Sequence, residues 1–382
     1  MAGPVRLPIN LDALQGYLET SVPEIKTPLS IKQFGDGQSN PTYQLTGADG
    51  NRYVLRKKPP GPLLSQTAHN VEREYRVLRA LEKTDVPVPK VYCLCTDPSI
   101  IGTIFYVMEF LDGRIFIQQS LPGVSPSERT SMWRSAVETL ARIHRVDYKG
   151  LGLGSLEKPD KFYVRQIRTF KSLSIQQAQA TDKETGAPVA KVPHFNEMTE
   201  AFEVAQYQPE DRKTLIHGDY MMHNLLFHKT EPYVIGVLDW EMTTVGHPLA
   251  DLVNVTAPFV SATASTHVGA NKDSAAFKPG ATQGLPTREQ CVEWYAQVAR
   301  WDPSEDLAWG DAFSAFRTAV VMQGIAARYA LRQNSSVRAS EFDLQVAPNS
   351  HWAWELVQRF KKQRGKRTLS PRKRGTPSSG RL

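Results

Sequence analysis

Two short segments constrain this chain more than any other feature: LIHGDYMMHNLLF (215–227) and VIGVLDWE (234–241). The first places Asp219 five residues before Asn224, and the second places Asp239 at the end of an apolar run. Phosphoryl transfer from a nucleotide requires an Asp that accepts a hydroxyl proton, an Asn five residues later and a second Asp for magnesium. The spacing therefore predicts a catalytic loop followed by a strand that ends in a metal-binding residue.

The residue types in these segments fit that chemistry. Asp219 would orient an acceptor hydroxyl and take its proton late, because a loose phosphoryl transition state depends on positioning and charge neutralisation. His217 lies in the same segment and is a second candidate catalytic residue. Asn224 offers a neutral oxygen and Asp239 an anionic one, which together suit Mg²⁺. A simple turn between two strands is the alternative, but it explains neither Asn224 nor Asp239.

The catalytic segment resembles the His-Gly-Asp-x-x-x-x-Asn signature of the aminoglycoside phosphotransferase family, and LDWEMTTVGHPLADL (238–252) continues that family pattern. The chain is also similar to the kinase-like N-terminal domain of acyl-CoA dehydrogenase family members ten and eleven, through YVLRKKPPG (53–61) and VEREYRVLRAL (71–81). The resemblance implies an α+β, protein-kinase-like fold of two lobes, a small β-rich N-lobe and a larger, mostly helical C-lobe. His223 stands where relatives often carry Asp, which leaves the choice of acceptor open.

The resemblance and the composition divide the chain into four segments. They are an N-terminal helical extension (1–29), a nucleotide-binding N-lobe (30–111), a catalytic and acceptor-binding C-lobe (112–358) and a basic, disordered tail (359–382). We expect strands over 30–34, 43–46, 53–57 and 104–113, and helices over 71–81, 127–146, 161–180, 288–300 and 307–333. Residues 253–284 are rich in small and polar residues and are expected to form a long loop near the acceptor.

A glycine-bearing turn between the first two predicted strands is a candidate phosphate loop, because backbone N–H groups without neighbouring side chains approach phosphate closely. Its candidate nucleotide-binding residues are Gly35, Gly37, Ser39 and Asn40. A common hairpin turn has the same sequence signature.

Arg56 occupies the strand position that carries a lysine in protein kinases. Strand alternation places it on the same face as Val54, and its planar guanidinium can hold two phosphate oxygens. Glu74, on the predicted helix 71–81, is the expected ion-pair partner, with Glu72 as the alternative. A solvated basic strand end is the simpler reading of the same residues.

The predicted strand over 104–113 breaks over 109–113, and its candidate adenine-binding residues are Glu109, Phe110 and Leu111. This break resembles the hinge between kinase lobes, where backbone groups would bracket the adenine of ATP. An interior strand followed by a turn would have the same sequence, so both readings stay open here.

The resemblance implies ATP and Mg²⁺ as cofactors and a small molecule with a hydroxyl group as acceptor, a hydroxyacyl-CoA in the relatives named. Aminoglycoside, choline and sugar acceptors are alternatives within the same fold. A pseudokinase, or a nucleic-acid-associated binding module that uses the tail, is the alternative from another functional class. Retention of Asp219, Asn224 and Asp239 together favours the enzyme.

Charge is distributed unevenly along the chain. Residues 359–382 hold ten Lys or Arg and no Asp or Glu, so subtracting them from the net charge of +7 leaves −3 for the rest. We therefore expect nucleic acid to bind only through the tail, if at all. No apolar run approaches the ~20 residues that span a bilayer, and three cysteines provide no disulfide framework. A cytoplasmic location is expected, with a nuclear or peroxisomal one as the alternative.

Overall fold

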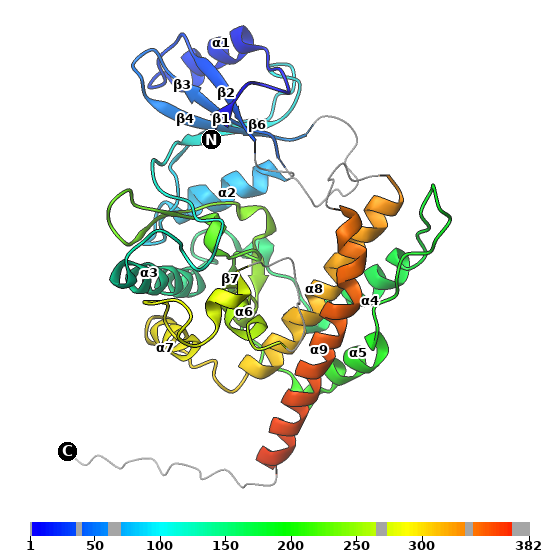
Figure 1. Cartoon of the computed structure of the whole chain (residues 1–382). Helices are drawn as coiled ribbons and strands as arrows, with labels where there is room; N and C mark the ends of the chain where they lie inside the picture. The colour runs from blue at the N-terminus through cyan, green and yellow to red at the C-terminus, as the bar shows by residue number, and fades with distance from the viewer. Residues whose placement is uncertain (1, 36–39, 60–69, 265–272, 333–338, 369–382) are drawn as a thin grey trace, which may run out of the picture. The chain divides into compact units, whose positions relative to one another are not determined.

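The computed structural model describes residues 2–35, 40–59, 70–264, 273–332 and 339–368 (Figure 1). The chain divides into two compact units. The first consists of Met1–Pro159, Arg212–Phe259 and Ala275–Asp302, and the second of Asp160–Asp211, Val260–Ser274 and Pro303–Leu382. The first unit includes the whole predicted N-lobe and both segments of the predicted catalytic site. The predicted boundaries at 29/30 and 111/112 stay predictions.

The first unit begins with a six-stranded antiparallel sheet, in the order β1-β2-β3-β4-β6-β5. Its strands are β1 (Ala2–Gly3), β2 (Ser30–Phe34), β3 (Thr42–Thr46), β4 (Arg52–Lys57), β5 (Val91–Cys95) and β6 (Phe105–Glu109). Alternate side chains of a strand share a face, and Tyr43, Leu45 and Leu55 form a buried core with Leu14 and Leu18. The strands expected over 30–34, 43–46 and 53–57 are confirmed to within a residue, and β6 lies inside the one expected over 104–113.

Two helices accompany this sheet. In α1 (Leu11–Ser21), the Asn10 side chain accepts a hydrogen bond from the first turn and caps the helix. In α2 (Val71–Leu81), Asn70 does the same, and the helix contacts β5 and β6. The range of α2 confirms the predicted helix over 71–81. Its buried face is apolar except for Glu74, which is thereby directed at the sheet.

The catalytic segments form two small antiparallel pairs. They are β7 (Thr214–Ile216) with β10 (Thr244–Gly246), and β8 (Leu225–Phe227) with β9 (Val234–Val237). One-turn helices η3 (Met222–Asn224) and η4 (Trp240–Met242) follow β7 and β9 along the chain. The same unit contains α3 (Pro126–Arg145), α7 (Arg288–Ala299) and η1 (Gly154–Leu156). It also contains all but the last two residues of α6 (Leu249–Ser261) and all but the first residue of η5 (Ser274–Phe277). Figure 1 shows α3 and α7 side by side.

The second unit is helical in its described part. It contains α4 (Phe162–Gln177), α5 (Phe195–Glu203), η2 (Ala205–Tyr207), α8 (Leu307–Ala330) and α9 (Ala339–Thr368). Its core is aromatic: Phe202 packs edge-on against Trp309, and the Trp309 and Phe313 rings are stacked with centroids 5.1 Å apart. The helices predicted over 161–180 and 307–333 are confirmed as α4 and α8.

The prediction of a loop over 253–284 is wrong at its start. The helix α6 continues to Ser261, because Val253 and Val255 are buried and extend the apolar face that begins at Leu249. Small polar residues between these apolar ones obscured the helical periodicity. Residues 265–272 lie outside the described part of the chain.

The predicted start of the tail at Arg359 also needs correction. Helix α9 runs to Thr368, and Phe360 is 1% exposed. Arg364 donates a hydrogen bond of 2.9 Å to Asp306, so a basic residue is used in a contact within the unit. Charge alone therefore predicted the wrong boundary, and residues 369–382 lie outside the described part.

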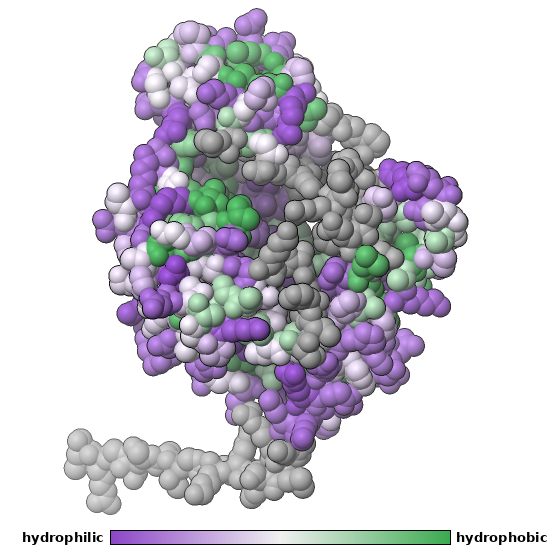
Figure 2. Space-filling model, in the orientation of Figure 1, coloured by the Kyte–Doolittle hydropathy of each residue, from purple (hydrophilic) through white to green (hydrophobic). Residues whose placement is uncertain are grey.

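The face of the molecule seen in Figure 2 is mainly hydrophilic, with small separate hydrophobic patches. Within the described residues, no helix is both long and apolar enough to cross a membrane. The antiparallel sheet and the mostly helical remainder confirm the predicted α+β class.

Candidate active site

Asp219 and Asn224 face each other across the loop between β7 and β8. The Asn224 side-chain amide donates to the Asp219 carboxylate oxygen Oδ2 at 3.2 Å and to the Asp219 backbone carbonyl at 2.9 Å. Since the amide nitrogen is used in this way, the Asn224 Oδ1 oxygen is the atom left for a cation. The loop also needs Gly218, whose φ is +86° and where a Cβ atom would lie 2.6 Å from the Met242 carbonyl oxygen.

A buried network of hydrogen bonds around Asp251 fixes the backbone of this loop. Asp251 of α6 accepts hydrogen bonds from the backbone N–H groups of His217 at 2.7 Å and Gly218 at 2.9 Å, and its carboxylate lies 3.3 Å from His144 Nε2. Burial alone would raise the Asp251 pKa, but the hydrogen bond and charge of His144, with the contact to His217, lower it below its ordinary value. Asp251 therefore stays ionised and fixes the backbone just before Asp219.

His217 is fully buried, and both of its ring nitrogens are occupied. Its Nδ1 atom accepts from the Asp219 N–H at 3.2 Å, and its Nε2 atom donates to the Leu238 carbonyl at 2.9 Å. This geometry gives His217 a positioning role between the catalytic loop and the segment that leads to Asp239.

The two candidate metal ligands, Asn224 and Asp239, lie on segments whose backbones are hydrogen-bonded to each other. The Leu238 N–H donates to the Asn224 carbonyl at 2.9 Å, which places Asp239 next to the end of the catalytic loop. Asp239 has φ 64° and ψ 62°, in the left-handed region that Asp tolerates better than most residues. Such backbone strain is concentrated at functional sites.

Arg56, on strand β4, connects the sheet to Asp239 through an ion pair. Its Nε atom lies 3.1 Å from Glu74 Oε2, and its Nη2 atom lies 2.7 Å from Asp239 Oδ1 and 3.6 Å from Glu241 Oε2. The ion pair predicted between Arg56 and Glu74 is thus present, while Glu72 pairs with Lys58 at 2.8 Å instead. Burial raises the Glu74 pKa to about 7, against the attraction of Arg56 and with the help of the negative charges of Asp239 and Glu241.

Glu241 is a part of the site that the sequence analysis missed. Its carboxylate accepts from the Asn40 amide at 3.4 Å, and its backbone carbonyl accepts from the Arg73 guanidinium. Its position two residues after Asp239 was the only sequence feature that could have indicated a role in the site. The residues that it contacts, Asn40 and Arg73, lie far away in the sequence. Asp251 appeared in the sequence pattern, although nothing there indicated its hydrogen bonds.

The candidate phosphate loop is described only at its ends. Gly35 directly follows β2, and its carbonyl accepts a hydrogen bond of 3.3 Å from the Arg6 guanidinium, whereas Asn40 is buried and donates to Glu241. Gly37 and Ser39 lie outside the described residues, so their predicted contact with phosphate stays a prediction.

The hinge candidates lie where the chain leaves the sheet. Glu109 exchanges backbone and side-chain hydrogen bonds with Lys90, at 2.8 and 3.2 Å. Phe110 lies under the Arg52 guanidinium, 4.2 Å from its ring centroid, and Leu111 packs against Gly236 of β9, where a Cβ atom would lie 2.4 Å from the leucine. These contacts fix the hinge against β4 and β9. Binding of adenine by residues 109–111 stays a prediction.

The donor set fits magnesium rather than a metal bound by protein alone. No group of three or more His, Cys, Asp or Glu side chains within the described residues could hold a metal ion. One carboxylate from Asp239 and one amide oxygen from Asn224 match instead the sparse protein ligation of Mg²⁺, which takes its other ligands from phosphate and water. The residues present therefore fit the ion.

A sheet carrying an Arg–Glu pair, an Asp–Asn loop and a second Asp define the kinase-like class of phosphotransferases, which use a hydroxyl group as acceptor. The family follows from comparison with known proteins. The model of the phosphotransferase enzyme family matches residues 30–286, more than half of the sequence, and the chain belongs to this family.

Comparison with individual proteins supports the same family membership. The chain is 38% identical over 333 residues to acyl-CoA dehydrogenase family member 11 from Gallus gallus, covering 87% of this chain and 41% of that protein. A crystal structure of a candidate aminoglycoside phosphotransferase from Ralstonia eutropha is 35% identical, with a TM-score of 0.78 over 92% of this chain and 99% of that one. The chain thus spans about two-fifths of the length of the Gallus gallus relative.

A more distant structure supports the fold alone. The streptomycin-ATP-APH(2")-IIa ternary complex is 13% identical, with a TM-score of 0.52 over 92% of this chain and 97% of that chain. Together with the Ralstonia eutropha structure it confirms the predicted protein-kinase-like fold.

Proposed function

We propose that this chain transfers the γ-phosphoryl group of ATP, with Mg²⁺, to the hydroxyl group of a small molecule, and that the acceptor is a hydroxyacyl-CoA. The observation that carries the proposal is the joined geometry of Asp219, Asn224 and Asp239. Asn224 contacts Asp219 through its side chain and the residue before Asp239 through its backbone. A protein that only binds a ligand has no need of all three.

Asp219 is the group that orients the acceptor. Its carboxylate is held on one side by the Asn224 amide at 3.2 Å, which leaves its other oxygen to accept a hydrogen bond from the acceptor hydroxyl. As the bond to phosphorus forms, the hydroxyl proton passes to this oxygen. His217 and Asp251 keep the carboxylate in place through the backbone.

Asn224 and Asp239 would hold Mg²⁺. When bound, the ion supplies neutralisation of the phosphate charge that develops during transfer. Arg56 supplies a second, permanent positive charge at the same corner, and Glu74 restricts the direction of its guanidinium. The Gly35–Asn40 turn and the 109–111 hinge would bind the phosphates and the adenine, as the family resemblance implies.

ATP as donor is supported by family membership and by the likeness of fold to the streptomycin-ATP complex. The acceptor class is supported by the Gallus gallus relative, whose name refers to acyl-CoA. Aminoglycosides, amino alcohols and sugars are the alternatives that the same fold supports. Fold alone does not select among them.

The test is a measurement of ADP release with a matched set of acceptors: hydroxyacyl-CoAs, aminoglycosides, amino alcohols and sugars. Mass spectrometry of the acceptor identifies the phosphorylated product, and the non-hydroxylated acyl-CoA of equal chain length is the control. We expect ADP and phosphorylated hydroxyacyl-CoA in equal amounts. If another acceptor class is phosphorylated and the hydroxyacyl-CoA is not, the acceptor assignment is refuted. The assignment of phosphotransferase activity would still stand.

A further inference from the structure

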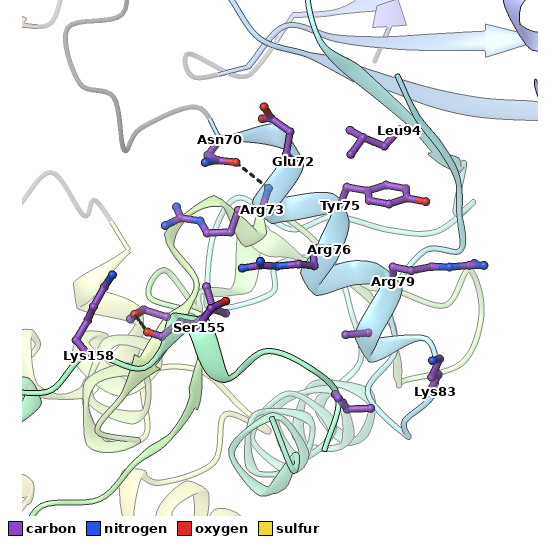
Figure 3. Close-up of a pocket in the computed structure, with 14 residues that line it drawn as sticks. Asn70, Glu72, Arg73, Tyr75, Arg76, Arg79, Lys83, Leu94, Ser155 and Lys158 are labelled. Atoms are coloured by element: carbon purple, nitrogen blue, oxygen red, sulfur yellow. Dashed lines mark hydrogen bonds between the residues drawn. The ribbon is translucent and has the colours of Figure 1, made fainter. Parts of the chain in front are cut away.

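A basic cavity of about 760 Å³ lies along α2 (Figure 3). Charged side chains dominate its lining, with five cations and one carboxylate. They are Arg73, Arg76, Arg79, Lys83, Lys158 and Glu72. None of these residues has a role in the proposed transfer reaction.

The positive charge of the cavity is only partly compensated. The Glu72 carboxylate is already paired with Lys58 at 2.8 Å, and Arg79 is paired with Glu82 at 2.9 Å. Arg76 and Lys158 form no ion pair with any residue that the structure describes, and both are exposed. The cavity therefore attracts anions from solution.

Arg73 and Arg76 extend from the same side of α2. Figure 3 shows the Arg73 and Arg76 side chains leaving α2 on the side that faces Ser155 and Lys158, whereas Arg79 extends to the other side of the helix. Their spacing of three residues places both guanidinium groups on one helix face. The Arg73 Nε atom is buried and has no hydrogen-bond acceptor among the described residues. Two planar guanidinium groups, an ammonium group and a hydroxyl are the donor set that phosphate groups require.

Arg73 connects the cavity to the residues around Asp239. The Arg73 guanidinium donates to the backbone carbonyl of Glu241, whose carboxylate lies 3.6 Å from Arg56 Nη2. Arg56 in turn contacts Asp239 at 2.7 Å. A ligand bound between Arg73 and Lys158 would thus extend away from the site where phosphoryl transfer takes place.

We propose that this cavity binds the phosphate groups of the CoA carrier of the acceptor. The inference rests on the proposed function, in which the acceptor is a hydroxyacyl-CoA. CoA carries a diphosphate and a ribose phosphate at the end opposite its acyl group, so anchoring that end leaves the acyl chain free to reach Asp219. Leu151 and Leu156 supply an apolar wall in the same cavity, whose volume is in the usual range for small-ligand sites.

Charge reversal tests the assignment. Arg76→Glu and Lys158→Glu each remove one cation that no ion pair holds, so both variants should fold. Arg145→Glu is the matched control, because Arg145 is exposed at the end of α3, outside the cavity, and forms no ion pair with a described residue. Calorimetry with CoA itself, at saturating Mg·AMP-PNP, measures binding while the nucleotide site is filled.

We expect Arg76→Glu and Lys158→Glu each to weaken CoA binding by roughly tenfold or more, the scale of a lost charged hydrogen bond. Arg145→Glu should bind CoA as the unmodified protein does, and Mg·AMP-PNP affinity should be the same in all. Pantetheine, which lacks the phosphates, should not bind, and pyrophosphate should compete with CoA. With a hydroxyacyl-CoA as substrate, Arg76→Glu should raise KM about tenfold and leave kcat nearly unchanged.

Three results would overturn the proposal: CoA affinity unaltered in both variants, CoA displaced by Mg·AMP-PNP, or pyrophosphate binding without CoA binding. Failure of the proposed function gives a different pattern. CoA would then still bind with dependence on Arg76 and Lys158, but no hydroxyacyl-CoA would be phosphorylated.

Discussion

The backbone N–H of Leu238 donates a hydrogen bond of 2.9 Å to the backbone carbonyl of Asn224. This bond joins the end of the catalytic loop to the residue that precedes Asp239. The backbone therefore keeps the two candidate metal ligands on adjoining segments of the chain.

Substitution of Asp239 tests the metal site. Both Asp239→Asn and Asp239→Ala should lose Mg²⁺-dependent nucleotide binding, because the neutral Asn224 oxygen is a poor sole ligand. Asparagine tolerates the left-handed backbone of this position, whereas alanine adds strain of about 1–2 kcal/mol. Calorimetry with AMP-PNP, with and without Mg²⁺, measures binding, and thermal melting should show that only the alanine variant is appreciably less stable. Unchanged Mg·AMP-PNP affinity in Asp239→Asn would contradict the assignment.

The pH dependence of stability tests the environment of Glu74. Its pKa is raised to about 7 in the folded protein, above the value of about 4.3 in an unfolded chain. The folded state therefore binds this proton more tightly, and the resulting stabilisation is complete below about pH 4.3 and is lost as the pH rises through about 7. Relative to Glu74→Gln, which cannot ionise, the unmodified protein should lose unfolding free energy across that interval.

Denaturant titrations at a series of pH values provide the measurement. Glu138→Gln is the control, because Glu138 is paired with Arg134 in an exposed i,i+4 contact and its removal should give a nearly constant difference. A constant difference for Glu74→Gln as well would mean that Arg56 keeps Glu74 ionised at all these pH values.

Asp251 should be essential for the stability of the catalytic loop. Asp251→Ala leaves the backbone N–H groups of His217 and Gly218 buried without an acceptor, at about 1–3 kcal/mol each. Asp251→Asn keeps one acceptor oxygen and should be intermediate in unfolding free energy. Chemical denaturation gives the order of the three proteins, and an alanine variant as stable as the unmodified protein would show that the network does not support the loop.

Two truncations locate the end of the folded part. Removal of residues after Thr368 should leave stability and turnover unchanged, because it keeps the whole of α9, including Phe360 and the Arg364–Asp306 contact. Removal after Arg359 should lower stability by about 1.5–3 kcal/mol, since it deletes the buried Phe360, and it also deletes the Arg364–Asp306 contact. Any salt-sensitive nucleic-acid binding should already disappear with the shorter truncation. Equal stability of the two products would restore the tail boundary at Arg359.

The sequence predicted those features that depend on residue type and short spacing. Asp219, Asn224 and Asp239 were singled out because phosphoryl transfer demands these side chains at set intervals, and their roles stay predictions. The helix α2 was predicted correctly because its apolar residues recur at helical spacing. The Arg56–Glu74 pair was found through resemblance to kinases, which supplies a long-range contact that periodicity cannot supply.

Other features depend on contacts between distant parts of the chain. Glu241 joins the site only because Asn40 and Arg73 approach it from residues far earlier in the sequence. The continuation of α9 past Arg359 depends on burial of Phe360, whereas composition indicated only a run of basic residues. In both cases packing outweighed the local signal on which the prediction relied.

The most direct test of the central claim is single-turnover phosphoryl transfer by Asp219→Asn. The amide keeps the size of the carboxylate and can still contact Asn224, but it cannot accept the acceptor proton. We predict an unchanged affinity for Mg·AMP-PNP and a transfer rate lower by roughly 10²-fold or more, the usual scale for loss of a general base. Transfer at the rate of the unmodified protein would contradict the account, because another group would then have to take the proton.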